Sequence, residues 1–151
     1  MAADLESVLV GEIADSVSDT HLRAQNKLVF LNTSDVLLGK VLHRTYSDVR
    51  HWPGQAKKSV RRDDILFSEI RPANGRWAFI DFDAADFVVS TKLMVIRPRA
   101  KRVVPRFLYH FLTSAETTGW SYPDSVDGFA LGSQAVIHRR LGPEGCAGHV
   151  A

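Results

Sequence analysis

Short apolar segments follow one another closely through the middle of the chain, and this feature constrains the fold most. Each is three or four residues long and rich in β-branched or aromatic side chains: 65–67, 77–80, 87–89 and 93–96. Turn-forming residues separate them, as at Arg71-Pro72-Ala73-Asn74-Gly75, where proline fixes φ and Asn-Gly tolerates positive φ. The pattern predicts buried strands joined by tight connections.

The flanking segments carry weaker signals. Leu28 to Leu31 is another short apolar run and predicts a strand. The polar residues 32–35 after it either turn the chain or cap one short helical turn through Leu38, stopped by Gly39. Residues 8–17 fit a short helix or the start of a strand.

A helix is expected near the C-terminal end of this region. Pro105 suits a first helical position, and apolar residues recur on one face at Phe107, Leu108, Phe111 and Leu112. The fold class predicted from these patterns is therefore α+β, a β-rich domain with a C-terminal helix.

The residues after this helix follow a different pattern. Six of the ten glycines lie between Gly119 and the C-terminus, without sustained periodicity. We therefore expect one domain over residues 1–118 and an irregular tail over 119–151.

The size and composition restrict the class of protein. A chain of 151 residues has room for one domain, not for a catalytic and a recognition domain together. The single cysteine, Cys146, excludes an internal disulfide and fits a reducing cytoplasm. The acidic N-terminus is unlike a signal peptide, and no apolar run approaches the ~20 residues that span a membrane. We expect a cytoplasmic protein.

The net charge of +2 conceals an uneven distribution of basic residues. Residues 36–76 carry nine basic and four acidic side chains, and residues 97–106 carry five basic and no acidic ones. Concentrated cations on a nearly neutral chain favour a local phosphate-binding face. Alternatively, the charge blocks are only solvated surfaces.

Several motifs keep a common order and spacing over more than half of the chain. They are Leu31–Leu37, Asp64–Ser68, Glu69-Ile70-Arg71-Pro72-Ala73-Asn74-Gly75-Arg76, Val88–Leu93 and Pro105–Leu112. Through them, the segment from Phe30 to Thr113 resembles a target-recognition domain of the specificity subunit of type I restriction–modification enzymes. Leu9–Ile13 resembles the usual start of such a domain.

The resemblance implies sequence-specific binding of double-stranded DNA. In this family a subunit normally has two recognition domains, each reading half of a split site, separated by long helices. Those helices dock two methyltransferase (modification) subunits, and nuclease subunits join the assembly. Methyl transfer from S-adenosylmethionine takes place in the partners, so the resemblance implies that this chain is not an enzyme and holds no cofactor or metal.

The sequence departs from the family pattern after the predicted helix. It has one recognition domain, and no long amphipathic spacer helix follows. We therefore expect a truncated or frame-shifted reading frame, in which assembly with the partner subunits is in doubt, or a remnant without function.

Phosphate contacts require long cationic side chains, and we assign Lys57, Lys58, Arg61 and Arg62 to this role. Phosphate contacts position a protein on DNA, whereas contacts to base edges supply the sequence information. As an alternative, Arg61 and Arg62 only flank a turn and pair locally with Asp63 and Asp64.

Base contacts are assigned to the turn that contains Pro72. Arginine can bind guanine O6 and N7, and asparagine can bind adenine N6 and N7, which makes Arg71, Asn74 and Arg76 candidates. Structural alternatives exist for two of them. Asn74 can serve turn geometry with Gly75, and Arg71 can pair with Glu69.

Further candidates lie in two polar segments. Ser90, Thr91 and Lys92 interrupt an apolar run, so their polar groups either face DNA or form internal hydrogen bonds. The segment 43–58 is predicted to be a long loop, in which Arg50 and His51 offer hydrogen-bonding groups and Tyr46 and Trp52 offer stacking. Trp52 can equally anchor this loop to the core.

The second basic stretch is predicted to be an exposed loop between Pro98 and Pro105. Either it contacts the DNA backbone or it is only solvated. Its cationic residues are Arg97, Arg99, Lys101, Arg102 and Arg106.

A metal-dependent nuclease is the alternative from another class of protein. Asp64, Glu69 and Arg71 distantly resemble an acid–acid–basic nuclease pattern, but arginine is a poor substitute for the usual lysine. Asp81, Asp83 and Asp86 are spaced as ordinary loop acids. Cys146 and His149 supply half of a zinc site at most. Neither a phosphate-binding glycine loop nor a nucleophile elbow is found.

Overall fold

The structure is a computed structural model that describes residues 5–18, 26–51, 56–68, 74–114 and 136–140. The chain forms two compact units. We call Ser16–Arg97 the sheet unit, and Met1–Asp15 with Pro98–Ala151 the helix unit. The boundary expected at residues 118 and 119 stays a prediction.

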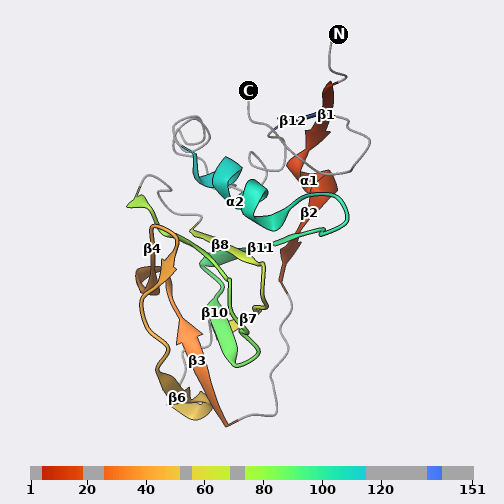
Figure 1. The fold of residues 1–151 in the computed structure, drawn as a ribbon. Coiled ribbons are helices and arrows are strands. Elements are labelled where there is room, and N and C mark those ends of the chain that lie inside the picture. The colour runs from red at the N-terminus through yellow and green to blue at the C-terminus, as the bar shows by residue number, and fades with distance from the viewer. Residues whose placement is uncertain (1–4, 19–25, 52–55, 69–73, 115–135, 141–151) are drawn as a thin grey trace. The chain divides into compact units, whose positions relative to one another are not determined.

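The first sheet of the sheet unit has the strand order β6-β3-β10-β7. Its strands are β6 (Tyr46–Asp48), β3 (Lys27–Leu31), β10 (Phe87–Ser90) and β7 (Ala56–Ser59). The two central strands, β3 and β10, run parallel and lie side by side in Figure 1. All four residues of β10 are buried, as expected for an apolar strand that has a neighbour on each side.

The second sheet has the order β2-β11-β8-β9. Its strands are β2 (Ala14–Val17), β11 (Leu93–Pro98), β8 (Ile65–Ser68) and β9 (Trp77–Phe79). Strand β8 is antiparallel to both β11 and β9 and is buried along its whole length. These strands confirm the predicted apolar segments, and side chains such as Val29, Leu66 and Val95 form the shared core of the sheet unit.

Strand β8 has two ends, which we name after the residues found there. At the Asp64 end, the amide of Ile80 donates to Asp64 O, and Ile65 pairs with Ile96. At the Ser68 end, Ser68 pairs with Leu93 of β11, and its amide donates to Arg76 O. The Ser68 end therefore brings together the β10–β11 turn and the chain that leads into β9.

A small hairpin replaces the helical turn expected through Leu38. The 3-10 helix η1 covers only Thr33–Asp35 and is followed by β4 (Val36–Leu37) and β5 (Lys40–Val41). The two-residue loop between these strands has positive φ at both positions, 45° at Leu38 and 91° at Gly39. Positive φ at both loop residues is the geometry that suits a two-residue hairpin.

The segment 43–58, predicted to be a long loop, is more regular than expected. It contains β6, the 3-10 helix η2 (Val49–His51) and most of β7. Its strands pair with β3 and β10, so main-chain hydrogen bonds of the sheet override a polar sequence that carries no strand pattern.

The helix unit contains β1 (Leu5–Leu9), α1 (Val10–Ile13), α2 (Pro105–Thr113) and β12 (Val136–Arg140). Helix α2 confirms the predicted helix, with proline in its first turn and Leu108 and Leu112 buried. Strand β12 pairs antiparallel with β1, so the expectation of an irregular tail over 119–151 is wrong for these five residues. Pairing with a distant strand, invisible to local periodicity, explains the difference. Among the described residues, no helix is long and apolar enough to cross a membrane.

Candidate nucleic-acid interface

Five of the predicted DNA-contacting residues gather at the Ser68 end of β8: Lys58, Asn74, Arg76, Thr91 and Lys92. The strand order places Ser68 between Leu93 and Arg76. Since neighbouring strands lie ~4.8 Å apart, the main chains at Leu93 and Arg76 are roughly 10 Å apart. Residues from three separate segments of the sequence thus reach one end of the sheet.

Lys58 reaches this end from β7 in the other sheet. Its Nζ donates to Thr91 O at 3.2 Å and to Leu93 O at 2.9 Å. These carbonyl oxygens position the ammonium, which has three hydrogen-bond donors in all. Beside it, Thr91 and Lys92 are exposed, while Ser90 is buried and its Oγ accepts from the amide of Lys92 at 3.2 Å. The internal hydrogen bond considered for Ser90 is confirmed.

Arg76 connects this end to the β4–β5 hairpin. Its Nη1 donates to Ser34 O at 3.3 Å and to Val36 O at 3.2 Å, and the side chain is half-buried. Gly75 has φ of 70°, which confirms a turn role for Asn74-Gly75, and the Asn74 side chain is exposed. Arg76 is therefore held in place by neutral acceptors and keeps its positive charge.

Arg61 and Arg62 lie at the Asp64 end instead. Four residues of β8 separate the two ends, which corresponds to ~13 Å along the strand. Arg62 Nη1 donates to Asp81 O at 2.8 Å, and Arg61 is exposed. Exposed Asp63, Asp81 and Asp83 lie in the two turns at this end, so its charge is mixed.

A buried ion pair occupies the interior of the Asp64 end. Arg97 Nε lies 2.9 Å from Asp64 Oδ1 and Arg97 Nη2 lies 2.8 Å from Asp64 Oδ2. Asp64 is fully buried and also accepts from the amide of Arg61 at 3.0 Å. The expectation that Arg97 belongs to an exposed loop is wrong, because it ends a buried strand next to a carboxylate that needs a partner.

The same ion pair bears on the nuclease alternative. Both oxygens of Asp64 are bound by Arg97, which removes this carboxylate from the set that could bind Mg²⁺. In the part of the chain that the structure describes, no three His, Cys, Asp or Glu side chains gather as a metal site would require. Glu69, Arg71, Cys146 and His149 lie outside the described residues.

Two further predicted cations are paired with carboxylates. Arg50 forms a bidentate pair with Asp48, with Nη2 to Oδ2 at 2.8 Å and Nε to Oδ1 at 3.1 Å. This hydrogen bond and the carboxylate charge raise the pKa of Arg50. Arg99, in the helix unit, forms a similar pair with Asp15, with Nη2 to Oδ1 at 2.6 Å. The side chains of His51, Trp52 and Lys57 lie outside the description.

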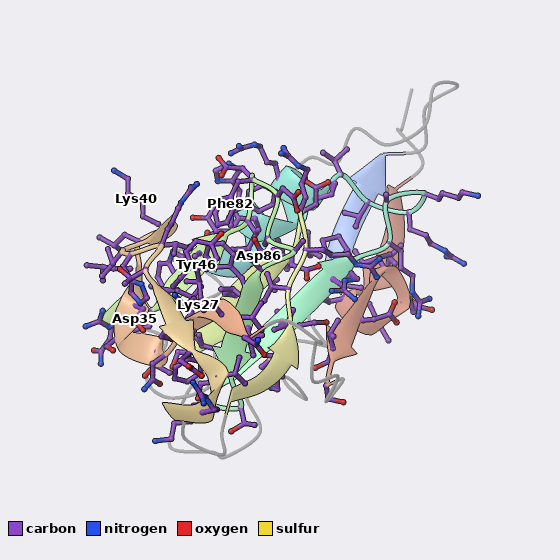
Figure 2. All side chains as sticks on the ribbon, turned by 90° about the horizontal axis from the view of Figure 1, so that it is seen from below. Lys27, Asp35, Lys40, Tyr46, Phe82 and Asp86 are labelled. Atoms are coloured by element: carbon purple, nitrogen blue, oxygen red, sulfur yellow. The ribbon has the colours of Figure 1, made fainter. Side chains whose placement is uncertain are left out.

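Further exposed groups of the sheet unit include Tyr46, singled out from the sequence for stacking, and Arg44 and Lys40, which were not singled out. The Arg44 guanidinium carbon lies 4.0 Å from the centroid of the Phe82 ring, a cation–π contact between loops that no local spacing predicts. The Tyr46 hydroxyl donates to Asp86 at 3.1 Å, and these two residues lie close together in Figure 2. Lys40, on β5, is exposed and projects away from the ribbon in the same view.

Comparison with known proteins identifies the relatives of this chain. The specificity subunit of the type I restriction enzyme HindI of Haemophilus influenzae is 48% identical over 117 residues, which are 77% of this chain and 26% of that protein. The chain is related to type I restriction specificity subunits. It spans about a quarter of the length of this curated relative. No protein-family model matches the sequence.

Solved structures agree with this relationship at the level of the fold. The HsdS subunit from Thermoanaerobacter tengcongensis matches with a TM-score of 0.66 and 24% identity, over 89% of this chain and 37% of that one. A chain from a study of complex assembly and conformational transition in the type I R-M system matches with a TM-score of 0.71 and 23% identity, over 95% and 40%. The β-rich α+β fold of a specificity-subunit recognition domain, predicted from the sequence, is confirmed.

Proposed function

We propose that the sheet unit binds double-stranded DNA and reads its sequence, as one target-recognition domain of a type I restriction–modification specificity subunit. The observation that carries the proposal is the 48% identity with the HindI specificity subunit, which covers most of this chain. The gathering of five predicted contact residues at the Ser68 end supports it independently of sequence identity.

Positioning on the phosphate backbone falls to cations at both ends of β8. Lys58 and Lys92 supply this at the Ser68 end, and Arg61 and Arg62 supply it roughly 13 Å away at the Asp64 end. The main-chain distance between the two ends is close to the width of the major groove, which is about 12 Å. Lys57, Arg50 and His51 complete the proposed set, with Arg50 the weakest member because Asp48 already neutralises it.

Reading of bases falls to the turn before β9. Asn74 and Arg76 present an amide and a guanidinium at the Ser68 end, and Arg71 precedes them in the same segment of sequence. Of the guanidinium nitrogens of Arg76, Nη1 is bound to carbonyl oxygens, which fixes the group's orientation before DNA arrives. A fixed orientation lowers the entropic cost of binding. Thr91 adds an exposed hydroxyl beside Lys92.

The wider assembly forms a separate part of the proposal. As part of a specificity subunit, the chain would direct methyltransferase and nuclease partners to its site without catalysing a step itself. The ion pair between Asp64 and Arg97 supports a chain that catalyses no step itself, since this carboxylate stabilises the fold. A cytoplasmic location, expected from the sequence, belongs to the same proposal.

Selection from a randomised duplex pool tests the DNA-binding function. The full chain is mixed with the pool at about 50 and 150 mM salt, and bound duplexes are sequenced and titrated. Each phosphate neutralised contributes about −0.9 to the log–log slope, so four cations predict a roughly fifty-fold loss of affinity over this range. Enrichment of one short sequence, with this salt dependence, is the expected result. Binding that does not change with salt, together with an unenriched pool, would overturn the proposal.

A further inference from the structure

Leu38 occupies an unfavourable position in the β4–β5 hairpin. Its φ is 45°, in the left-handed region, which costs an L-residue with a branched side chain free energy that asparagine or glycine would avoid. The side chain is also 67% exposed, so burial from water does not offset this cost. An exposed leucine at the tip of a strained turn therefore indicates a role other than stabilising the fold.

The main chain at the tip of the β4–β5 hairpin is fixed by hydrogen bonds. Its amide donates to Gly75 O at 2.7 Å, and the amide of Gly39 donates to Trp77 O at 2.9 Å, which fixes the hairpin tip on the chain leading into β9. A Cβ at Gly75 would lie only 2.6 Å from Leu38 Cδ2, so one leucine methyl rests directly against the glycine. The hairpin tip therefore contacts Gly75, which follows Asn74 in the segment proposed to read bases.

Two cationic side chains lie near this apolar tip. Lys40 is exposed two residues further along the hairpin, and Arg76 binds the carbonyl oxygens of Ser34 and Val36 at its base. The acid of this region, Asp35, lies 3.4 Å from His43 Nε2 and accepts from the amide of Asn32 at 2.7 Å. This combination suits a partner that presents negatively charged groups to the cations and an apolar group to Leu38.

Duplex DNA has that combination in its major groove. The groove is wide enough, at about 12 Å, to admit a two-stranded β-ribbon such as β4–β5, whereas the minor groove, at about 6 Å, is not. Leucine has no donor or acceptor, so it reads a base edge only through apolar contact, and the apolar group on the base edges is the 5-methyl of thymine.

We propose that Leu38 is a specificity-determining residue that contacts a thymine 5-methyl group in the major groove. The inference rests on the proposed function and adds an apolar contact to the polar readout by Asn74 and Arg76. It assigns to the β4–β5 hairpin a recognition role in addition to its place in the fold.

Replacing thymine by uracil in the selected duplex tests the contact, because uracil differs only by the missing 5-methyl group. At one thymine, uracil should lower the affinity of the full chain roughly fourfold, the value of one buried methyl. Leu38→Gly removes the side chain and tolerates the positive φ, so it should bind the thymine duplex about as weakly as the wild type binds the uracil duplex. The variant should then no longer distinguish thymine from uracil at that position.

Leu42→Ala is the matched control, since Leu42 is also exposed (54%) and follows the same hairpin. It should retain the preference for thymine. The inference is overturned if no uracil substitution changes wild-type affinity, a result that needs no variant to fold. It is also overturned if Leu38→Gly weakens thymine and uracil duplexes equally, as a wedge between bases would. If the wild type binds no duplex at all, the proposed function itself fails.

Discussion

The two ends of strand β8 hold their cationic side chains in different ways. At the Asp64 end, a buried carboxylate neutralises Arg97, and acidic loop residues accompany Arg61 and Arg62. At the Ser68 end, main-chain carbonyl oxygens hold Lys58 and Arg76. A carboxylate cancels a cation, whereas a carbonyl oxygen orients it and leaves its charge available. The kind of acceptor therefore separates Arg97, whose charge is used within the fold, from Arg62 and Arg76, whose charge a carbonyl oxygen leaves available.

Replacing Arg97 by alanine should give the largest effect, because Asp64 would remain buried without its partner. We expect the free energy of unfolding to fall by about 3–5 kcal/mol. Denaturant titration followed by tryptophan fluorescence measures it. Arg99→Ala is the matched control, since the Arg99–Asp15 pair is largely exposed, and it should unfold at nearly the wild-type midpoint. Equal losses of unfolding free energy in the two variants would show that Arg97 stabilises the fold no more than the exposed Arg99 does.

Gly75→Ala sharpens the comparison at the Ser68 end. The new Cβ would collide with Leu38 and would have to adopt φ of 70°, at a cost of about 1–2 kcal/mol. The same denaturant titration applies. In a double variant with Leu38→Ala the collision is relieved but the φ strain stays, so the loss should be smaller than the sum of the single losses. Strict additivity would mean that the glycine and the leucine do not touch.

Lys92→Ala tests whether the Ser68 end supplies available charge. Removal of one phosphate contact should reduce the magnitude of the salt slope by about 0.9 and weaken all duplex sequences alike. Titration of two unrelated duplexes at several salt concentrations measures the slope. Arg50→Ala is the comparison, because Asp48 already neutralises Arg50, and it should reduce the magnitude of the slope by less than Lys92→Ala does. The reverse order of effects would contradict the role given to the acceptor.

The smallest expected effect concerns Tyr46 and Asp86, near the mixed-charge end. The hydrogen bond to the Asp86 carboxylate, with its negative charge, raises the pKa of Tyr46 above its ordinary value near 10. The folded chain therefore holds the phenolic proton more tightly than the unfolded chain. The resulting stabilisation is complete below about pH 10 and is lost as the pH rises through the raised pKa.

Ultraviolet absorbance of the phenolate reports this titration. Asp86→Asn should lower the midpoint, whereas Asp83→Asn should not, because Asp83 accepts from the amide of Ala85 instead. An unchanged midpoint in Asp86→Asn would show that the carboxylate does not act on the phenol.

The sequence predicts those parts of the fold in which local pattern and burial agree. The apolar runs that became β8, β9, β10 and β11 are buried between neighbours, and Pro105 begins α2 as expected. The β4–β5 hairpin was not predicted, because leucine at a positive-φ position contradicts the usual turn preference. Strand β12 depends on pairing with β1, more than a hundred residues away, which periodicity does not encode.

The candidate site was predictable in its residue types but not in its grouping. Lys58, Arg76 and Lys92 were selected from the sequence for their charge, and the sheet register brings them together. The partners that decide availability are distant in sequence: Asp64 for Arg97, and the carbonyl oxygens of Ser34 and Val36 for Arg76. Charge counted along the chain therefore overestimates the cations that can reach DNA.

The parallel pairing of β3 with β10 has a consequence for biogenesis. Val29 of β3 pairs with Phe87 of β10, so roughly 60 further residues must leave the ribosome before the first sheet can form. The β4–β5 hairpin, in contrast, can form within microseconds of its synthesis. During translation, the hairpin segment would thus be exposed to water, with Leu38 at its tip, long before Gly75 and Trp77 arrive to hold it.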